Sequence, residues 1–131
     1  MGPTHVENGG VDTPWMEYFA VAARMRAVDL IPLAADWKPD LVVHEETELA
    51  GPAVAAYTGA RLVVHGLGLM PPLRIWEAFA PAIDRLLRQW DAPTGAEAVR
   101  DATYLEICPP SLRPPGERVW RRTRTLRPAG G

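Results

Sequence analysis

Cysteine is nearly absent from this sequence, and so are the other marks of an exported or membrane-bound protein. Cys108 is the one cysteine among 131 residues, which excludes a disulfide within the chain and favours a reducing, cytoplasmic compartment. No apolar run reaches the roughly 18 residues of a membrane-spanning helix. The polar N-terminus also lacks the basic and apolar blocks of a signal peptide.

Positive charge is not in excess either. The net charge is −2, so nothing draws the whole chain toward nucleic acid or an anionic membrane. Nucleic-acid binding is therefore not expected, and an arginine-rich C-terminal tail is better explained as a solvated or interface-forming strip. That tail contains Arg113, Arg118, Arg121, Arg122, Arg124 and Arg127.

What the sequence does contain is an alternation of helical and strand patterns in one domain of ordinary composition, with 47% hydrophobic residues. Helices are predicted over residues 15–35, 48–57, 74–90 and about 94–100, and short buried strands over 41–44, 61–65 and 104–107. Pro32 and Pro81 predict a kink or an early stop in their helices. A strand, a helix and a strand within about 25 residues favour a right-handed βαβ connection. The fold class is therefore α/β, a small parallel sheet flanked by helices.

A polar cluster of His44, Glu45, Glu46 and Glu48 follows the first predicted strand. In open parallel sheets ligands bind beyond the carboxyl ends of the strands, so these side chains are candidates for a cleft and for proton transfer. The structural alternative is that Glu46 and Glu48 favour the positive N-terminus of the next helix while His44 packs at the strand end. No metal site is predicted, because no second histidine follows at i+4 and no cysteine pair exists.

The second predicted strand ends in His65-Gly66-Leu67-Gly68, whose glycines would let a ligand approach the backbone closely. A plain tight turn is the alternative. The pattern fails as a dinucleotide fingerprint, since G-x-G-x-x-G is absent and two prolines follow. Parallel strands would bring His44 and His65 to the same rim. An apolar pocket wall or simply core packing is predicted for Met70, Trp76, Phe79 and Trp90.

Several motifs together resemble a known family. They are W-K-P-D-L-V-V-H-E with E-x-A-G-P, then V-x-H-G-x-G, then Y-L-E-I-C-P-P-S-L, and finally L-R-P. They look like the N-terminal domain of actinobacterial natural-product glycosyltransferases of the macrolide and enediyne type. The resemblance runs from about Phe19 to Pro128. It implies a partial GT-B N-terminal domain, Rossmann-like, in which residues 13–128 form the acceptor-binding part, after a flexible stretch at 1–12 and before a linker start at 129–131.

The resemblance also implies roles for particular residues. Such enzymes, of the hexosyltransferase type, move a sugar from a nucleotide donor to a small-molecule aglycone in antibiotic biosynthesis, and a histidine acts as general base. By position Glu45 matches the acid that orients this base. The residues that match acceptor-side loops or a pocket wall are His44, Glu48, His65, Gly66, Gly68, Met70 and Trp76.

The family's base and its donor domain have no counterpart in this sequence. His5 lies in a polar tail with no preceding strand, and no phosphate cradle is present. Sugar transfer by this chain alone is therefore not expected, and no cofactor is predicted. The alternatives are a stand-alone binding protein for a hydrophobic natural product, or a chain that complements a partner. An uncovered sheet edge or face predicts a homo-oligomer or a complementing chain.

Overall fold

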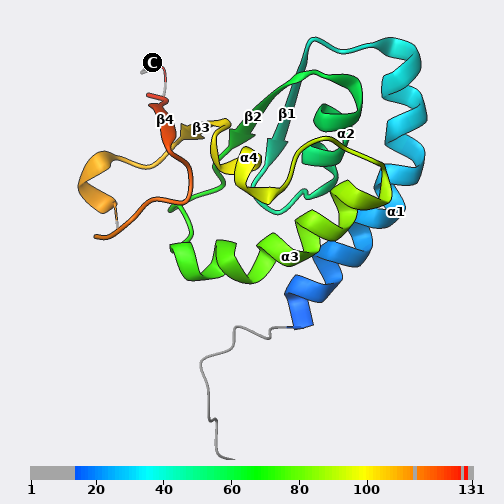
Figure 1. Ribbon diagram of the computed structural model, residues 1–131. Coiled ribbons are helices and arrows are strands. Elements are labelled where there is room, and N and C mark those ends of the chain that lie inside the picture. The colour runs from blue at the N-terminus through cyan, green and yellow to red at the C-terminus, as the bar shows by residue number, and fades with distance from the viewer. Residues whose placement is uncertain (1–13, 114, 128, 130–131) are drawn as a thin grey trace, which may run out of the picture.

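The computed structural model describes residues 14–113, 115–127 and 129 (Figure 1). The predicted flexible stretch at residues 1–12 lies outside the described residues, as do Thr13 and most of the predicted linker start. Nine elements follow one another along the chain, namely α1 (Pro14–Trp37), β1 (Leu41–Glu45), α2 (Ala50–Thr58), β2 (Arg61–His65), α3 (Leu73–Gln89), α4 (Ala96–Arg100), β3 (Thr103–Glu106), the 3₁₀ turn η1 (Pro110–Leu112) and β4 (Arg122–Thr125).

The described strands form one parallel sheet in the order β1-β2-β3-β4, which confirms the predicted α/β class. Residues opposite one another fall into rows across the sheet. Glu45 lies opposite His65, His65 opposite Leu105, and Leu105 opposite Arg124. Because side chains alternate between faces, every residue of this row projects from the same face.

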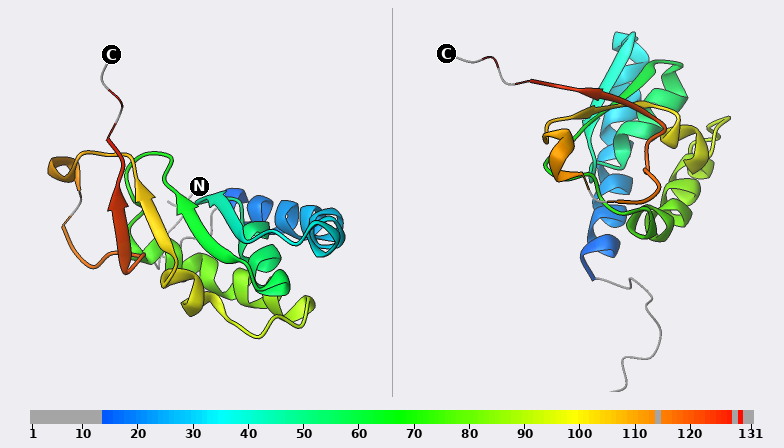
Figure 2. Two further views of the ribbon diagram at one scale, coloured as in Figure 1. Left: turned by 90° about the horizontal axis from the view of Figure 1, so that it is seen from above. Right: turned by 90° about the vertical axis from the view of Figure 1, so that its left-hand side faces the viewer.

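The helices cover the other face of the sheet. In Figure 2 α2, α3 and α4 lie beneath the strands, and α1 lies beyond β1 and packs against α2. The inward residues of α3 recur at three- and four-residue spacing and meet the inward strand residues Val64 and Tyr104, both of which are fully buried. Those residues of α3 are Trp76, Phe79, Ile83, Leu86 and Leu87.

The face turned away from the helices is open. On β1, Leu41 and Val43 are exposed by 48% and 53%, whereas His44, the next residue in the alternation, is buried on the helix side. Arg122 and Arg124 of β4 are exposed, and by register they share the open face with Val43 and Glu45. The open face therefore carries exposed apolar residues and Glu45 on the edge strand β1, and a basic column of Arg122 and Arg124 on β4.

Neither proline ends its helix, so the early stop, one of the two predicted effects, does not occur. α1 continues beyond Pro32 to Trp37, and α3 runs through Pro81 to Gln89. A proline removes one backbone hydrogen bond, but apolar residues on either side remain buried against α2 or the sheet. Ile31 and Ala34 flank the first proline, and Phe79 and Ile83 flank the second, so packing outweighs the lost bond.

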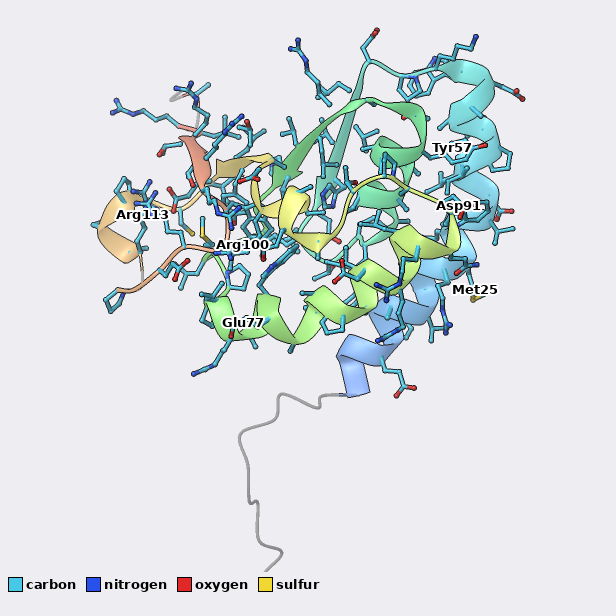
Figure 3. All side chains as sticks on the ribbon, in the orientation of Figure 1. Met25, Tyr57, Glu77, Asp91, Arg100 and Arg113 are labelled. Atoms are coloured by element: carbon cyan, nitrogen blue, oxygen red, sulfur yellow. The ribbon has the colours of Figure 1, made fainter. Side chains whose placement is uncertain are left out.

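The arginine-rich tail contains a strand that the sequence analysis missed. Arg100, only 8% exposed, donates from Nε to the Val119 carbonyl at 2.9 Å, and the Arg121 amide donates to the Arg100 carbonyl at 3.0 Å. Figure 3 labels Arg100, the last residue of α4. These contacts hold Trp120 in the core and direct residues 122–125 alongside β3. In the described part of the chain no helix is long and apolar enough to cross a membrane.

Candidate functional site

The carboxyl ends of the strands carry most of the polar residues that the sequence singled out. Glu45 and His65 are neighbours across β1 and β2, and both project from the open face. His44 lies one residue earlier and points to the helix side. His44 and His65 therefore reach the same end of the sheet but lie on opposite faces.

His44 packs against α2 instead of facing the open side. It is 8% exposed, and a Cβ placed on Gly51 would come within 2.6 Å of its Cβ and Cγ. Neither ring nitrogen has a hydrogen-bond partner among the described residues. Burial lowers the pKa of His44, and the nearby backbone and charges of Glu45 and Glu48 offset this only in part. His44 is thus packed between β1 and α2, and its predicted substrate-binding role stays a prediction.

Glu45 and Glu48 are both engaged with their own surroundings. The Glu45 carboxylate accepts hydrogen bonds from the Thr47 amide at 2.9 Å and the Thr47 hydroxyl at 2.5 Å, which shapes the turn after β1. Glu48 forms an ion pair with Arg26 of α1 and accepts from the Ala50 amide at 3.2 Å, at the first residue of α2. An acid at this position satisfies a free amide of the helix start.

His65 has one ring nitrogen in use. Its Nδ1 lies 2.8 Å from the Gly66 carbonyl oxygen, which can only accept, so Nδ1 carries the proton. In the neutral ring Nε2 is then a free hydrogen-bond acceptor among the described residues. Gly66 itself is needed for packing, because a Cβ there would fall 2.5 Å from the Tyr104 hydroxyl oxygen. Gly68 has nothing within 4 Å of such a Cβ, so the structure gives no packing reason for glycine there.

Glu46, in contrast, turns to the helix side and joins an aromatic cluster. Its Oε1 accepts a hydrogen bond from the Tyr104 hydroxyl and another from the Leu67 amide at 3.2 Å. The Tyr104 ring stacks on Trp120 with centroids 4.5 Å apart, and Trp120 meets Trp76 edge-on at 5.9 Å. Burial raises the pKa of Glu46, since the hydrogen bonds from Tyr104 and Leu67 compensate only partly. Burial, followed by the bond to Glu46, also raises the pKa of Tyr104.

A cavity of about 200 Å³ opens beside this cluster at the carboxyl end of the sheet. We call it the carboxyl-edge pocket. Its walls are mostly apolar and aromatic, and Glu46 and Thr47 are its polar members. It is lined by Glu46, Thr47, Leu49, Pro71, Ile75, Trp76, Phe79 and Trp120. Of the candidates named from the sequence, Glu46, Trp76 and Phe79 border it, whereas Met70 is buried in the core and does not line it.

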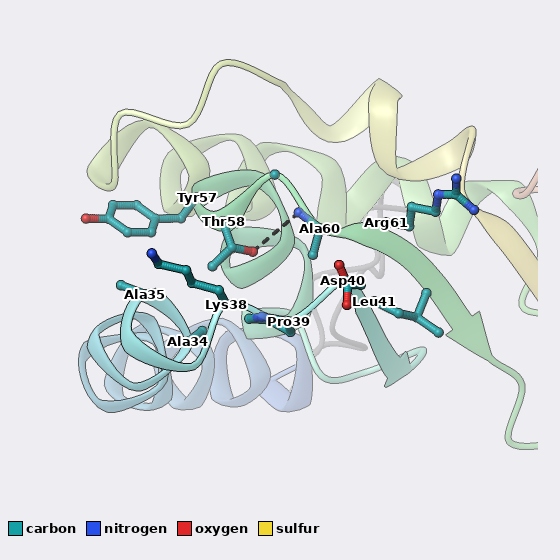
Figure 4. Close-up of a pocket in the computed structure, with 11 residues that line it drawn as sticks. Ala34, Ala35, Lys38, Pro39, Asp40, Leu41, Tyr57, Thr58, Ala60 and Arg61 are labelled. Carbon is teal, nitrogen blue, oxygen red and sulfur yellow. Dashed lines mark hydrogen bonds between the residues drawn. The ribbon is translucent and has the colours of Figure 1, made fainter.

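A wider cavity of about 810 Å³ lies at the amino ends of β1 and β2 (Figure 4). Lys38, Asp40, Tyr57, Thr58 and Arg61 are its polar residues, and α1 and α2 both end there. Ligands of open parallel sheets bind at the opposite end, beyond the carboxyl ends of the strands. The position in the sheet therefore favours the smaller carboxyl-edge pocket over the larger cavity as the ligand site.

Sequence reasoning missed two residues that help to build the pocket, Tyr104 and Trp120. Tyr104 is an inward residue of a strand that was predicted, but nothing in the sequence placed its hydroxyl against Glu46. Trp120 lies in the arginine-rich tail, which the sequence analysis interpreted as a solvated or interface-forming strip. The available signal was the strict alternation Arg122-Thr123-Arg124-Thr125 after Val119-Trp120, which is the period of a strand with one solvated face.

Comparison with known proteins matches residues 8–120 to the family described as "Erythromycin biosynthesis protein CIII-like, N-terminal domain". The chain is 39% identical over 94 residues to the L-demethylnoviosyl transferase of Streptomyces niveus, a match that covers 70% of this chain and 24% of that protein. It is 32% identical over 79 residues to the elloramycin glycosyltransferase ElmGT of Streptomyces olivaceus, covering 60% of this chain and 20% of that protein. The match thus spans a quarter or less of each relative.

Solved structures agree with the fold. The glycosyltransferase SnogD from Streptomyces nogalater superimposes with a TM-score of 0.67 and 26% identity, over 98% of this chain and 35% of that one. The spinosyn forosaminyltransferase SpnP gives a TM-score of 0.64 at 23% identity, over 79% of this chain and 31% of that one, which supports the fold alone.

Proposed function

We infer that this chain recognises the acceptor in a sugar-transfer reaction. The chain belongs to the erythromycin biosynthesis protein CIII-like N-terminal domain family. In this proposal the acceptor is a small-molecule natural product, and the sugar comes from a nucleotide-sugar donor that this chain does not hold. Glu45 and His65 lie on the open face of the sheet and do not line the carboxyl-edge pocket, where the acceptor would bind. The chain contributes binding and not turnover.

The observation that carries the proposal is the carboxyl-edge pocket. Small-molecule sites are concave and mostly apolar, with a few polar groups that fix orientation. Trp76, Phe79 and Trp120 supply the apolar walls, and Glu46 supplies a carboxylate at the rim. The position at the carboxyl end of a parallel sheet is where ligands of such sheets bind.

An aspartate in the pocket wall is expected to weaken binding at least tenfold. Ile75 lines the pocket and is half-buried, so Ile75→Asp would place a charge against the apolar part of the acceptor. Ile107→Asp is the matched control, because Ile107 is 37% exposed and does not line the pocket. Calorimetric titration with one macrolactone aglycone and one fused aromatic aglycone measures the effect.

We expect at least one aglycone to bind the unmodified chain and the Ile107→Asp variant equally, and Ile75→Asp to lose at least tenfold in affinity. Failure of both aglycones to bind at millimolar concentration would overturn the proposal. Equal binding by all three proteins would show that the acceptor lies elsewhere.

The open sheet face supports a proposal about partners, namely that two copies of this chain associate through it. A two-fold axis parallel to the strands would lay β1 of one copy over β4 of the other. The two copies would then face each other through the row of Glu45, His65, Leu105 and Arg124, in opposite strand order. Glu45 of one copy would lie over Arg124 of the second copy. Exposed Leu41 and Val43 would be covered in the same contact. The carboxyl-edge pocket lies on the helix side and stays accessible.

Charge reversal tests this association. Glu45→Arg and Arg124→Glu should each give a monomer by light scattering at micromolar concentration, because each places like charges opposite one another. The double variant should restore the dimer, and Glu77→Arg on the exposed side of α3 should leave it intact. A monomeric unmodified chain, or a double variant that fails to re-associate, would contradict the proposal.

A further inference from the structure

Glu46 connects two walls of the carboxyl-edge pocket. It lies in the turn that follows β1, and it lines the pocket itself. Its Oε1 accepts one hydrogen bond from the Tyr104 hydroxyl of β3 and another, at 3.2 Å, from the Leu67 amide in the loop between β2 and α3. One carboxylate oxygen therefore joins the carboxyl ends of three neighbouring strands.

The loop between β2 and α3 has little besides this bond to hold its first half. Leu67 and Leu69 are exposed by 61% and 54%, and the loop returns to the core at Met70. Among the described residues, the bond from the Leu67 amide to Glu46 is the only hydrogen bond that these two leucines make. Because Pro71 of the same loop lines the pocket, this bond helps to position a pocket wall.

The aromatic stack on the other side contacts the same carboxylate. The Tyr104 ring stacks on Trp120, which lines the pocket. A Cβ placed on Gly66 would come within 2.5 Å of the Tyr104 hydroxyl oxygen, so the start of the loop lies directly on that hydroxyl. Burial, followed by the bond to Glu46, raises the pKa of Tyr104, so the hydroxyl stays protonated and donates. Glu46 thus binds the loop and the stack at the point where they meet.

The charge of Glu46 sets the strength of both hydrogen bonds. Bonds to an ionised carboxylate are roughly twice as strong as bonds to a neutral acceptor. Burial raises the pKa of Glu46 and the charge of Glu45 adds to the rise, whereas the bonds from Tyr104 and Leu67 oppose it. All other residues that line the pocket are uncharged. Glu46 therefore loses its charge at a higher pH than an exposed glutamate does.

We propose that Glu46 is a latch for the carboxyl-edge pocket. While it is ionised, it holds the loop and the aromatic stack at the spacing that the acceptor needs, and loss of its charge loosens both. Glu46 is a positioning residue in this role, because it acts through Leu67 and Tyr104. Acceptor affinity then falls as the pH is lowered. This inference rests on the proposed acceptor-binding function and specifies how that site is regulated.

The Leu67 amide resonance in ¹⁵N spectra tests the latch without any ligand. An amide proton bonded to a carboxylate changes its chemical shift when the carboxylate is protonated, so this resonance should titrate with a midpoint above the usual glutamate pKa of about 4.3. Glu46→Gln keeps the shape without the charge and should abolish the titration. Tyr104→Phe should move the midpoint higher still, because it removes a bond that favours the ionised form.

Calorimetric titration with the macrolactone and fused aromatic aglycones then tests the effect on binding. At neutral pH Glu46→Gln should bind about tenfold more weakly than the unmodified chain. Glu77→Gln, on the exposed side of α3, should bind as the unmodified chain does. As the pH is lowered, the affinity of the unmodified chain should approach that of Glu46→Gln. Other titrating groups are the same in both proteins, so the difference between them isolates Glu46.

The outcomes separate the latch from the acceptor-binding function. If the Leu67 resonance does not titrate, or titrates alike in Glu46→Gln, the latch is overturned whether or not an aglycone binds. If an aglycone binds but its affinities for the unmodified chain and Glu46→Gln keep one ratio at every pH, the regulation is overturned and the function stands. If neither aglycone binds while Leu67 titrates as expected, the acceptor-binding function fails, and the regulation of that site fails with it.

Discussion

Trp120→Ala should lower the free energy of unfolding by about 3–5 kcal/mol, the usual cost of truncating a buried tryptophan. Trp120 is 2% exposed, stacks on Tyr104 with centroids 4.5 Å apart, and meets Trp76 at 5.9 Å. Its removal would open a cavity between β3 and α3 at the point where the pocket is formed. Urea unfolding followed by circular dichroism measures the loss.

Trp37→Ala is the matched control, because Trp37 at the end of α1 is 76% exposed. An exposed substitution of this kind should change stability by about 0.5 kcal/mol or less. If Trp120→Ala unfolds at the same urea concentration as Trp37→Ala, the C-terminal segment is not part of the core. The pocket would then lose the wall that this segment provides.

Gly51→Ala should destabilise the protein, although alanine is normally favoured over glycine inside a helix by about 1 kcal/mol. Gly51 lies in the first turn of α2, where an added Cβ would come within 2.6 Å of His44 Cβ and Cγ. Overpacking of this kind costs about 1–3 kcal/mol, because the strand and the helix must move apart. The expected sign is thus opposite to that of an ordinary helical glycine.

Gly68→Ala provides the comparison, since a Cβ at Gly68 meets nothing within 4 Å. Thermal unfolding should show a lower midpoint for Gly51→Ala and little change for Gly68→Ala. A stabilising Gly51→Ala would mean that α2 does not pack on His44. His44 would then be free to face a ligand, as its place in the sequence first allowed.

The sequence predicted most of the fold correctly where one period dominated the pattern. The apolar runs Leu62-Val63-Val64 and Leu41-Val42-Val43 identified two parallel strands, and the spacing of Phe79, Ile83 and Leu87 identified α3. β4 was missed because its alternation of arginine and threonine contains no apolar residue. The other strands were identified from their apolar residues. Pairing with β3 and the anchor from Arg100 decide its structure, and both are tertiary effects.

The side chains of the site could be predicted less well than the strands that carry them. Five consecutive polar residues, 44–48, span the end of β1 and the turn after it, but which face each one meets depends on a register and a turn that the sequence does not specify. Glu46 therefore reached Tyr104 and the pocket, while Glu45 bonded to Thr47 and His44 was buried. Trp76 lies on the buried side of α3 and lines the carboxyl-edge pocket, and its substrate-binding role stays a prediction.

Where a bound aglycone lies on the chain is the most direct test of acceptor recognition. Isotope-filtered NOE spectra of the labelled chain with an unlabelled aglycone report which side chains contact it. We expect NOEs to Ile75, Trp76 and Phe79 of the carboxyl-edge pocket. NOEs confined to Lys38, Tyr57 and other residues of the wide amino-end cavity would contradict the proposed site and the function built on it.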